Sequence, residues 1–157
     1  MAISGLERVK AALAELGSDC QVVELPDSTR TADDAAKAIG CTVAQIAKSI
    51  IFRASTTDRT VLVIASGVNR VSEARIAELL GEPIERATPD FVRERTGFAI
   101  GGVAPVGHAT PPVTFLDADL ARFAEVWAAA GTPHAVFKTT AAELEGATRA
   151  SVIQVTQ

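Results

Sequence analysis

Apolar positions near the start of the chain recur every three or four residues, as on one face of a helix: Leu6, Val9, Leu13 and Leu16. Ser4 with Glu7 forms a capping box that predicts where this helix begins, and Gly17 predicts where it ends. Residues 20–25 are rich in apolar and β-branched side chains and stop at Pro26. This segment predicts the first strand.

The same patterns continue along the chain. Further helical segments, most with a capping residue before them or a glycine after them, are predicted at residues 31–39, 43–46, 72–80, 91–96 and 140–144. Further strands are predicted at residues 48–53, 60–65, 84–87, 113–116, 125–129, 135–137 and 151–155. The strand at 60–65 is apolar on both faces and follows a turn, so we expect a hairpin with 48–53 in which it is the central strand.

Helices and strands alternate, but several strand pairs have no helix between them. This order favours a mixed α/β (α+β) fold, with a curved mixed sheet and helices packed outside it. No repeat, linker or low-complexity segment interrupts the pattern. We therefore expect a single domain over residues 1–157.

Composition narrows the function classes. Hydrophobic residues make up 48% of the chain and charged residues 22%, which is typical of a soluble globular protein and excludes a disordered or collagen-like chain. Aromatic residues are only 4%, and the formal net charge is −4. A broad basic or base-stacking face for nucleic acid is therefore not expected, and DNA is not an expected partner.

The sequence also gives little support for a metal site, a disulfide bond or a membrane segment. Cys20 and Cys41 are too few and too far apart for a thiolate zinc site, so we expect free thiols, no metal and no cofactor. The first eight residues lack the apolar core of a signal peptide, and no apolar run approaches the ~20 residues that span a bilayer. We expect a cytoplasmic protein without a membrane partner.

Common catalytic signatures are missing. The chain has no phosphate-binding Gly-x-x-x-x-Gly-Lys loop, no dinucleotide fingerprint and no Gly-x-Ser-x-Gly elbow. Its neighbouring acids, Asp33 with Asp34 and Asp117 with Asp119, stand at helix starts or strand ends, where capping explains them. An enzyme with this sequence is expected to work without a metal or a covalent nucleophile.

Lys48 is the first residue that stands out, because it interrupts an otherwise apolar strand. Burying an ammonium group is costly unless it reaches water or an anion. Two interpretations stay open. Lys48 either extends past the strand end to solvent, or it holds a phosphate or polarises a carbonyl oxygen.

A glycine-rich loop at residues 101–108 is the second feature, and we expect apolar strands on both sides of it. Its candidate residues are Gly101, Gly102, Pro105, Gly107 and His108. Glycines let a ligand approach main-chain N–H groups closely, which is how a site for a carbonyl oxygen can be built. The alternative is a plain turn with an exposed histidine.

The third feature is the turn into the strand at 135–137. Gly131 predicts the turn, and His134 places an imidazole beside the strand. His134 is either a substrate-contacting group or a histidine satisfied at the strand edge.

Together these features resemble the YbaK/EbsC family, the editing-domain superfamily that also supplies the insertion domain of bacterial prolyl-tRNA synthetases. The resemblance covers nearly the whole chain, and its most specific parts are QIAKSIIF at residues 45–52 and the Gly-x-x-x-Pro element GGVAP at 101–105, continued by 106–108. Residues 67–71 and the segment from 130 onward follow in the same order. The family's fold is a mixed, barrel-like sheet surrounded by helices.

The resemblance implies an enzyme that hydrolyses the ester of mischarged tRNA. The usual substrate is proline tRNA that wrongly carries cysteine or alanine. Such editing is needed because one methylene contributes only ~1–3 kcal/mol of discrimination in a synthetase pocket. The implied partners are the aminoacylated 3′ end of the tRNA and, as a candidate, prolyl-tRNA synthetase.

The resemblance also implies roles for individual residues. Lys48 would engage the terminal nucleotide and its phosphate, and the main-chain N–H groups of Gly101 and Gly102 would stabilise the developing oxyanion. Pro105 would set the path of the loop, and water would be the nucleophile. Gly107, His108, Gly131 and His134 would contact the substrate. The chain carries Ala129 and Val136 where some family members carry polar or acidic residues, which leaves the amino-acid specificity open.

Two main interpretations follow from the sequence, beside a third in which the protein is a hydrolase of small aminoacyl esters. One is a free-standing aminoacyl-tRNA deacylase, which the intact Lys48 and Gly101–Pro105 elements favour. The other is a non-catalytic module that binds aminoacyl-tRNA or a synthetase. In either case a small site can sit on an acidic domain if a partner delivers the tRNA.

Overall fold

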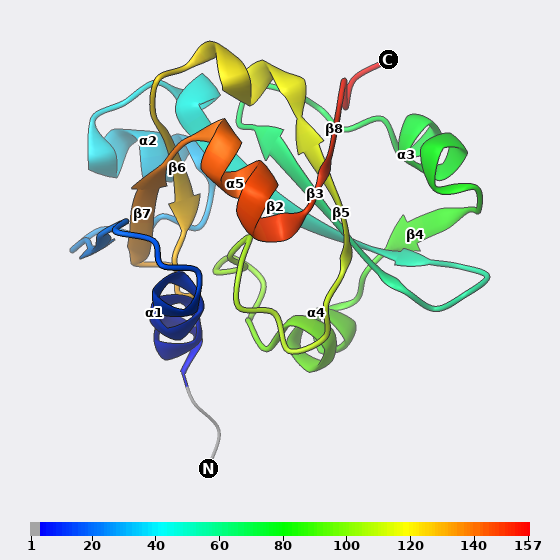
Figure 1. Ribbon diagram of the computed structural model, residues 1–157, viewed down its shortest axis with the longest axis horizontal. Helices are drawn as coiled ribbons and strands as arrows, with labels where there is room; N and C mark the ends of the chain where they lie inside the picture. Colours follow the sequence, from blue (N-terminus) through cyan, green and yellow to red (C-terminus); the bar gives the residue numbers. More distant parts are fainter. Residues whose placement is uncertain (1–3) are drawn as a thin grey trace.

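A mixed sheet forms the centre of the computed structural model, which describes residues 4–157 (Figure 1). Its strands are β1 Val22–Glu24, β2 Ile46–Ala54, β3 Thr60–Ser66, β4 Ile84–Arg86, β5 Val113–Asp117, β6 Val126–Ala129, β7 Ala135–Thr139 and β8 Ser151–Ile153. They follow the order β1-β7-β6-β2-β3-β5-β8, and β4 pairs with the far end of β2. Met1 to Ile3, part of the segment considered for a signal peptide, lie outside the described residues.

Both antiparallel and parallel pairs occur in this sheet, as the sequence predicted. β2 and β3 form the expected hairpin, whereas β2–β6, β3–β5 and β5–β8 run parallel. All seven residues of β3 are buried, which confirms it as a central strand. Within residues 4–157, β1 and β8 end the order without pairing with each other, so the sheet is open rather than a closed barrel.

The helices begin at the predicted caps. They are α1 Gly5–Glu15, α2 Ala32–Ile39, α3 Glu73–Leu80, α4 Pro89–Thr96 and α5 Ala141–Thr148, with short 3₁₀ helices η1 Val43–Gln45 and η2 Ala118–Arg122. The Ser4 and Thr31 hydroxyls accept hydrogen bonds from main-chain N–H groups three residues on, at 3.2 and 3.1 Å. α5 runs past its predicted end because Ala147, one turn later, packs against the core. Within the described residues, no helix is both long and apolar enough to cross a bilayer.

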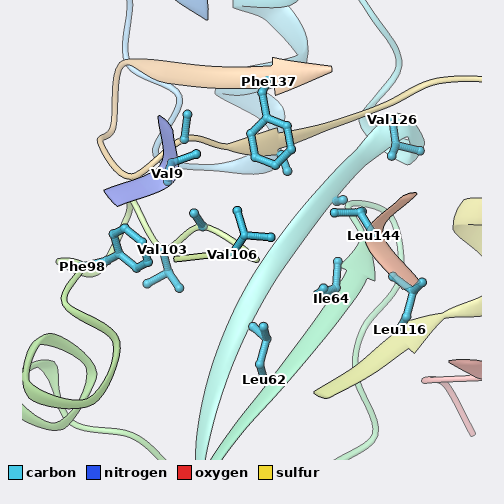
Figure 2. Packing of buried hydrophobic residues seen from close by; sticks show 14 of the residues in the cluster. Val9, Leu62, Ile64, Phe98, Val103, Val106, Leu116, Val126, Phe137 and Leu144 are labelled. Carbon is cyan, nitrogen blue, oxygen red and sulfur yellow. The ribbon is translucent and has the colours of Figure 1, made fainter. Parts of the chain in front are cut away.

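Side chains of the central strands alternate between the two faces of the sheet. Leu62 and Ile64 of β3 join the main core, to which α1, α4, α5 and residues 98–106 also contribute (Figure 2). Val61, Val63 and Ala65 point to the opposite face, where α3 packs on them through Ile76. α2 forms a separate small cluster on Ile46 of β2 and Trp127 of β6. The sheet is therefore covered on both faces.

The segment after α4 differs from the expectation of an apolar strand, and that prediction is wrong. Gly97 ends α4 in a left-handed conformation, with φ of 84°, and the chain turns there. Phe98 is buried in the core, but Ile100 is 49% exposed. A main-chain bond from the Gly102 N–H to the Ala99 carbonyl closes a turn. One anchoring phenylalanine, rather than strand pairing, therefore holds this segment.

The tip of the β2–β3 hairpin is tied down by Glu82, which follows α3. The Glu82 carboxylate accepts main-chain hydrogen bonds from Thr56 and Thr57 at 3.1 and 2.9 Å and pairs with Arg59 at 3.0 Å. The hydrogen bonds, led by the one from the Thr57 N–H, lower the pKa of Glu82 from 4.5 to about 2. The charged form is thus favoured in the folded protein.

Acid is therefore expected to weaken the fold through Glu82. Because the folded pKa lies below the unfolded one, this contribution is present above pH 4.5 and is lost as the pH falls towards about 2. Urea unfolding of the parent and of Glu82→Gln, at pH 7 and pH 3, measures it. The variant should be less stable at pH 7 and should lose less stability on acidification than the parent. The exposed Glu78→Gln is the control, and an acid dependence equal in Glu82→Gln and the parent would contradict the assignment.

Candidate active site

A cavity of about 270 Å³ lies along one edge of β2. On this edge β6 pairs with β2 up to Ala47, and β4 pairs with it from Phe52 onward. Among the described strands, none covers the stretch 48–51 between them. The lining residues are Thr29, Arg30, Thr31, Ala32, Ala35, Ile46, Ala47, Lys48, Ser49, Ile50, Ile51, Ala87, Val92, Ile100, Gly101, Val103, Trp127, Ala128, Ala129 and Val136.

Lys48 is half-buried in this cavity. Ile46 and Ile50 lie two positions away from Lys48 along β2, on the same face of the sheet. Ile46 packs in the cluster under α2 and Ile50 in the cluster under α3, so Lys48 lies between the parts of β2 that these helices cover. Burial lowers the pKa of the Lys48 ammonium, and the charge of Asp117 opposes this shift. A partly desolvated cation on a cavity wall is well placed to bind an anionic or carbonyl oxygen.

Asp117 lies on the same face of the sheet, two strands away from Lys48. Lys48 is opposite Ala65 in the β2–β3 ladder, and Asp117 follows the Leu116 that pairs with Ile64. Its buried carboxylate accepts hydrogen bonds from the Ser66 N–H, the Asn69 amide and the Asp119 N–H, at 3.0, 2.8 and 2.9 Å. The predicted capping role of Asp117 is confirmed, since it begins η2, a helix that the sequence pattern did not predict.

Gly101 reaches the cavity from the loop that follows α4. It has a φ of 94°, a left-handed conformation that favours glycine. The Arg30 side chain lies against it, so that a Cβ at this position would be only 2.8 Å from the Arg30 Nε. Gly101 and Lys48, predicted separately from the sequence, therefore line the same cavity.

Gly102 is placed differently. It is buried, and its N–H donates to the Ala99 carbonyl at 3.0 Å. A Cβ on Gly102 would be 3.0 Å from the Cα of Thr132, so the absence of a side chain allows close packing against the turn before β7. Gly102 supports the position of Gly101, and its N–H is already engaged.

The remaining candidate residues of the loop lie outside this cavity, although Val103 lines it. Pro105, Gly107 and His108 line a separate hollow between α1 and α5. The His108 Nε2 lies 2.6 Å from the Ala104 carbonyl oxygen, and the ring packs edge-on against Phe98. Burial lowers the pKa of His108, which favours the neutral imidazole. His108 is thus neither the exposed loop residue considered above nor in the Lys48 cavity.

The turn between β6 and β7 contacts α1 and the segment before α2, and through that segment it is connected to the cavity lining. Gly131, with a φ of 93°, packs against the main chain of Gly5 at the start of α1. The N–H and hydroxyl of Thr29 both donate to the Pro133 carbonyl, at 2.5 and 2.9 Å. His134 is exposed, and its N–H donates to the Thr132 hydroxyl at 3.1 Å. Neither Gly131 nor His134 lines the cavity.

The lining residues that the sequence pattern did not single out include three with polar or aromatic groups that matter for binding: Arg30, Ser49 and Trp127. Arg30 is an exposed residue in the turn before α2, a position where an arginine carries no distinctive pattern. Among the described residues that line the cavity, Arg30 and Lys48 are the only charged side chains. An acidic protein thus presents a cavity with two positive charges and no carboxylate in its lining, which selects for an anionic ligand.

The open mixed sheet and this cationic, otherwise largely apolar cavity define a small α/β domain suited to an anionic ligand. The sequence model of the aminoacyl-tRNA editing domain matches residues 26–147, and the chain belongs to this family. It is accordingly a hydrolase of the aminoacyl-tRNA deacylase type, and aminoacyl-tRNA is the substrate class of the family.

Individual relatives resemble this chain over nearly its whole length. The uncharacterized protein YwhH of Bacillus subtilis (strain 168) is 32% identical over 139 residues, which cover 88% of each chain. The crystal structure of a proposed trans-editing enzyme for prolyl-tRNA synthetase superposes with a TM-score of 0.92 at 46% identity, over 100% of this chain and 99% of that one. A scaffold protein used for computational epitope grafting gives a TM-score of 0.91 at 43% identity, over 98% and 97%. The expected fold and family are confirmed.

Proposed function

We propose that this protein is a free-standing deacylase that removes cysteine or alanine from mischarged proline tRNA. The observation that carries the proposal is the meeting of Lys48 and Gly101 in one cavity whose lining holds only positive charge. The relative that is 46% identical to this chain, described as a proposed trans-editing enzyme for prolyl-tRNA synthetase, supports the proline system and that synthetase as a candidate partner. We treat the whole chain as one editing domain, because α1, which precedes the matched region, contributes Val9 and Leu13 to the main core.

The proposed reaction is attack of water on the ester carbonyl that joins the amino acid to the terminal ribose. The carbonyl oxygen would lie against the main chain of Gly101, where the absence of a side chain permits close approach. The Lys48 ammonium would stabilise negative charge on the terminal nucleotide or on the developing oxyanion. The neighbouring ribose hydroxyl of the tRNA would orient the water and relay its proton. It would accept the proton that the attacking water loses and give its own proton to the ester oxygen, which leaves as an alcohol.

The other residues predicted for the site have supporting roles in this proposal. Gly102 and Pro105 hold the loop so that Gly101 faces the cavity, since both are buried. Gly107 and His108 anchor the far end of the same loop. Gly131 and His134 belong to the turn whose Pro133 carbonyl accepts the hydrogen bonds from Thr29 and so holds the segment before α2 in place.

The size of the cavity favours a small amino acid. Its lining contains Ala47, Ala128 and Ala129, and a volume of about 270 Å³ leaves little room beyond the end of a nucleotide and a short side chain. Editing sites of this kind act on residues that a synthetase pocket cannot reject by binding energy alone. Cysteine and alanine both meet this condition for a pocket that accepts proline.

Deacylation of proline tRNA charged separately with cysteine, alanine and proline tests the proposal. We expect release of cysteine or alanine at a rate well above that of the uncatalysed ester, and little release of proline. Hydrolysis of all three at equal rates would contradict the proposed specificity. Binding of the charged tRNA without hydrolysis would instead identify a binding module.

A further inference from the structure

The edge of β2 that faces the cavity carries main-chain groups that point away from β3. The Gly67 N–H donates to the Ile46 carbonyl at one end of the β2–β3 ladder, and the Ala54 N–H donates to the Arg59 carbonyl at the other. Hydrogen-bonded pairs alternate along an antiparallel ladder. The even-numbered residues of β2 therefore bond with β3, and the odd-numbered residues turn their N–H and C=O groups towards the cavity edge.

Two odd-numbered residues lie in the uncovered stretch, Ser49 and Ile51, and Ile51 directly adjoins the pairing with β4. Pairing with β6 ends at Ala47, and pairing with β4 begins at Phe52. The Ser49 hydroxyl is fully buried, yet the residue as a whole is partly exposed and lines the cavity. Its exposed part is thus the main chain and Cβ. The cavity wall therefore presents a hydrogen-bond donor and an acceptor side by side.

An aromatic ring and two cations surround this donor–acceptor pair. Trp127 pairs with Ile46 in the parallel β2–β6 ladder, so its indole is on the same face of the sheet as Lys48. Arg30 lies against Gly101 and lines the same cavity. An aromatic ring next to positive charge is the combination that binds a base together with its phosphate.

The two positive charges of the cavity favour one part of an aminoacylated nucleotide over another at the uncovered edge of β2. The amino group of the amino acid is a cation, and Arg30 and Lys48 would repel it while no lining carboxylate would attract it. It would also leave the Ser49 N–H without a partner. Adenine is neutral and presents a donor, the 6-amino group, beside an acceptor ring nitrogen, which complements a free C=O and N–H.

We propose that the uncovered edge of β2 at Ser49 recognises the adenine of the terminal nucleotide. The adenine 6-amino group donates to the Ser49 carbonyl, and a ring nitrogen accepts from the Ser49 N–H. The base stacks on Trp127, and Arg30 binds the phosphate that leads to the rest of the strand. This inference rests on the proposed function, because it assumes that the ligand ends in adenosine.

Binding of AMP and IMP to the intact protein tests the inference, with main-chain amide NMR shifts as the readout. In IMP an oxygen replaces the 6-amino group, so that an acceptor faces the Ser49 carbonyl. We expect AMP to bind about 10- to 100-fold more tightly than IMP and to shift the Ser49 amide signal. Equal binding of the two nucleotides, or no saturable shift with AMP, would overturn the proposal.

The Trp127→Leu variant tests the stacking contact separately. Leucine keeps an apolar side chain over α2, so the fold should persist, and we expect AMP and IMP to weaken together by about 5- to 100-fold. The preference for AMP over IMP should remain, because it resides in the main chain of Ser49. Phe123→Leu removes an aromatic ring outside the cavity and is the matched control. AMP binding unchanged in Trp127→Leu would overturn the stacking role.

These measurements do not depend on catalysis. A clear AMP preference in a protein that cleaves no aminoacyl ester would leave the adenine site standing and refute the proposed deacylation. Hydrolysis of aminoacyl-tRNA with equal binding of AMP and IMP would refute the adenine site and leave the proposed function standing.

Discussion

Replacing Lys48 with alanine is expected to lower kcat/KM for deacylation about 100- to 1000-fold, the usual effect of removing one preorganised charge-stabilising group. The Lys48 ammonium is half-buried on the cavity wall, and burial lowers its pKa. Folding therefore gains little from this charge, and its removal should leave the unfolding transition nearly unchanged. Release of cysteine and alanine from charged proline tRNA measures the loss.

Two further variants distinguish a role of Lys48 in the reaction from an effect of the protein's net charge on tRNA binding. Lys10→Ala removes an exposed lysine of α1, so the net charge changes equally while the cavity stays intact. Lys48→Arg keeps the charge but alters its geometry, and it should recover only part of the activity. A fully active Lys48→Ala enzyme would refute the proposed role, and a loss of the same size in Lys10→Ala would point to long-range attraction of the tRNA.

Gly101→Val is expected to abolish measurable turnover. Gly101 has a φ of 94°, which β-branched residues rarely adopt, and a Cβ there would be 2.8 Å from the Arg30 Nε. Valine would displace Arg30 and also block the approach of the ester carbonyl to the main chain. Single-turnover deacylation measures the effect, and thermal unfolding records the cost of the strained backbone, about 1–3 kcal/mol.

Gly81→Val is the matched control for this variant. Gly81 ends α3 with a φ of 89°, and a Cβ on it would have nothing within 4 Å. Both variants should lose similar stability, because both force valine into a left-handed conformation, but only Gly101→Val should lose activity. Wild-type turnover in Gly101→Val would show that the loop is a simple turn.

Local patterns predicted most of the secondary structure. The start of α1 followed from Ser4, and Thr31 and Thr88 cap α2 and α4 in the same way, because a capping hydroxyl acts on N–H groups only two or three residues away. The central position of β3 followed from its apolar residues on both faces. Such features are visible in a sequence because their causes lie within one or two turns of the chain.

The candidate site was predictable only in part. Lys48 was identifiable because a charged side chain within an apolar strand is costly to bury unless it reaches water or an anion. The glycine loop was identifiable as a unit, but which of its residues faces the cavity was not. Phe98 and His108 anchor the loop in the core on either side, and of its candidate residues Gly101 alone lines the cavity, together with its neighbour Val103.

By itself, then, the sequence determined most of the elements and their caps, the acidic balance and the two local irregularities at Lys48 and Gly101, but neither η2 nor the turn that follows α4. Only the tertiary structure decided that these irregularities meet, that Arg30 and Trp127 join them, and that β2 has an uncovered edge between β6 and β4. The physical reason is that the sequence pattern of a helix or strand depends on residues that are close together along the chain. A cavity depends on strands such as β2 and β6, which pair although they are far apart in sequence.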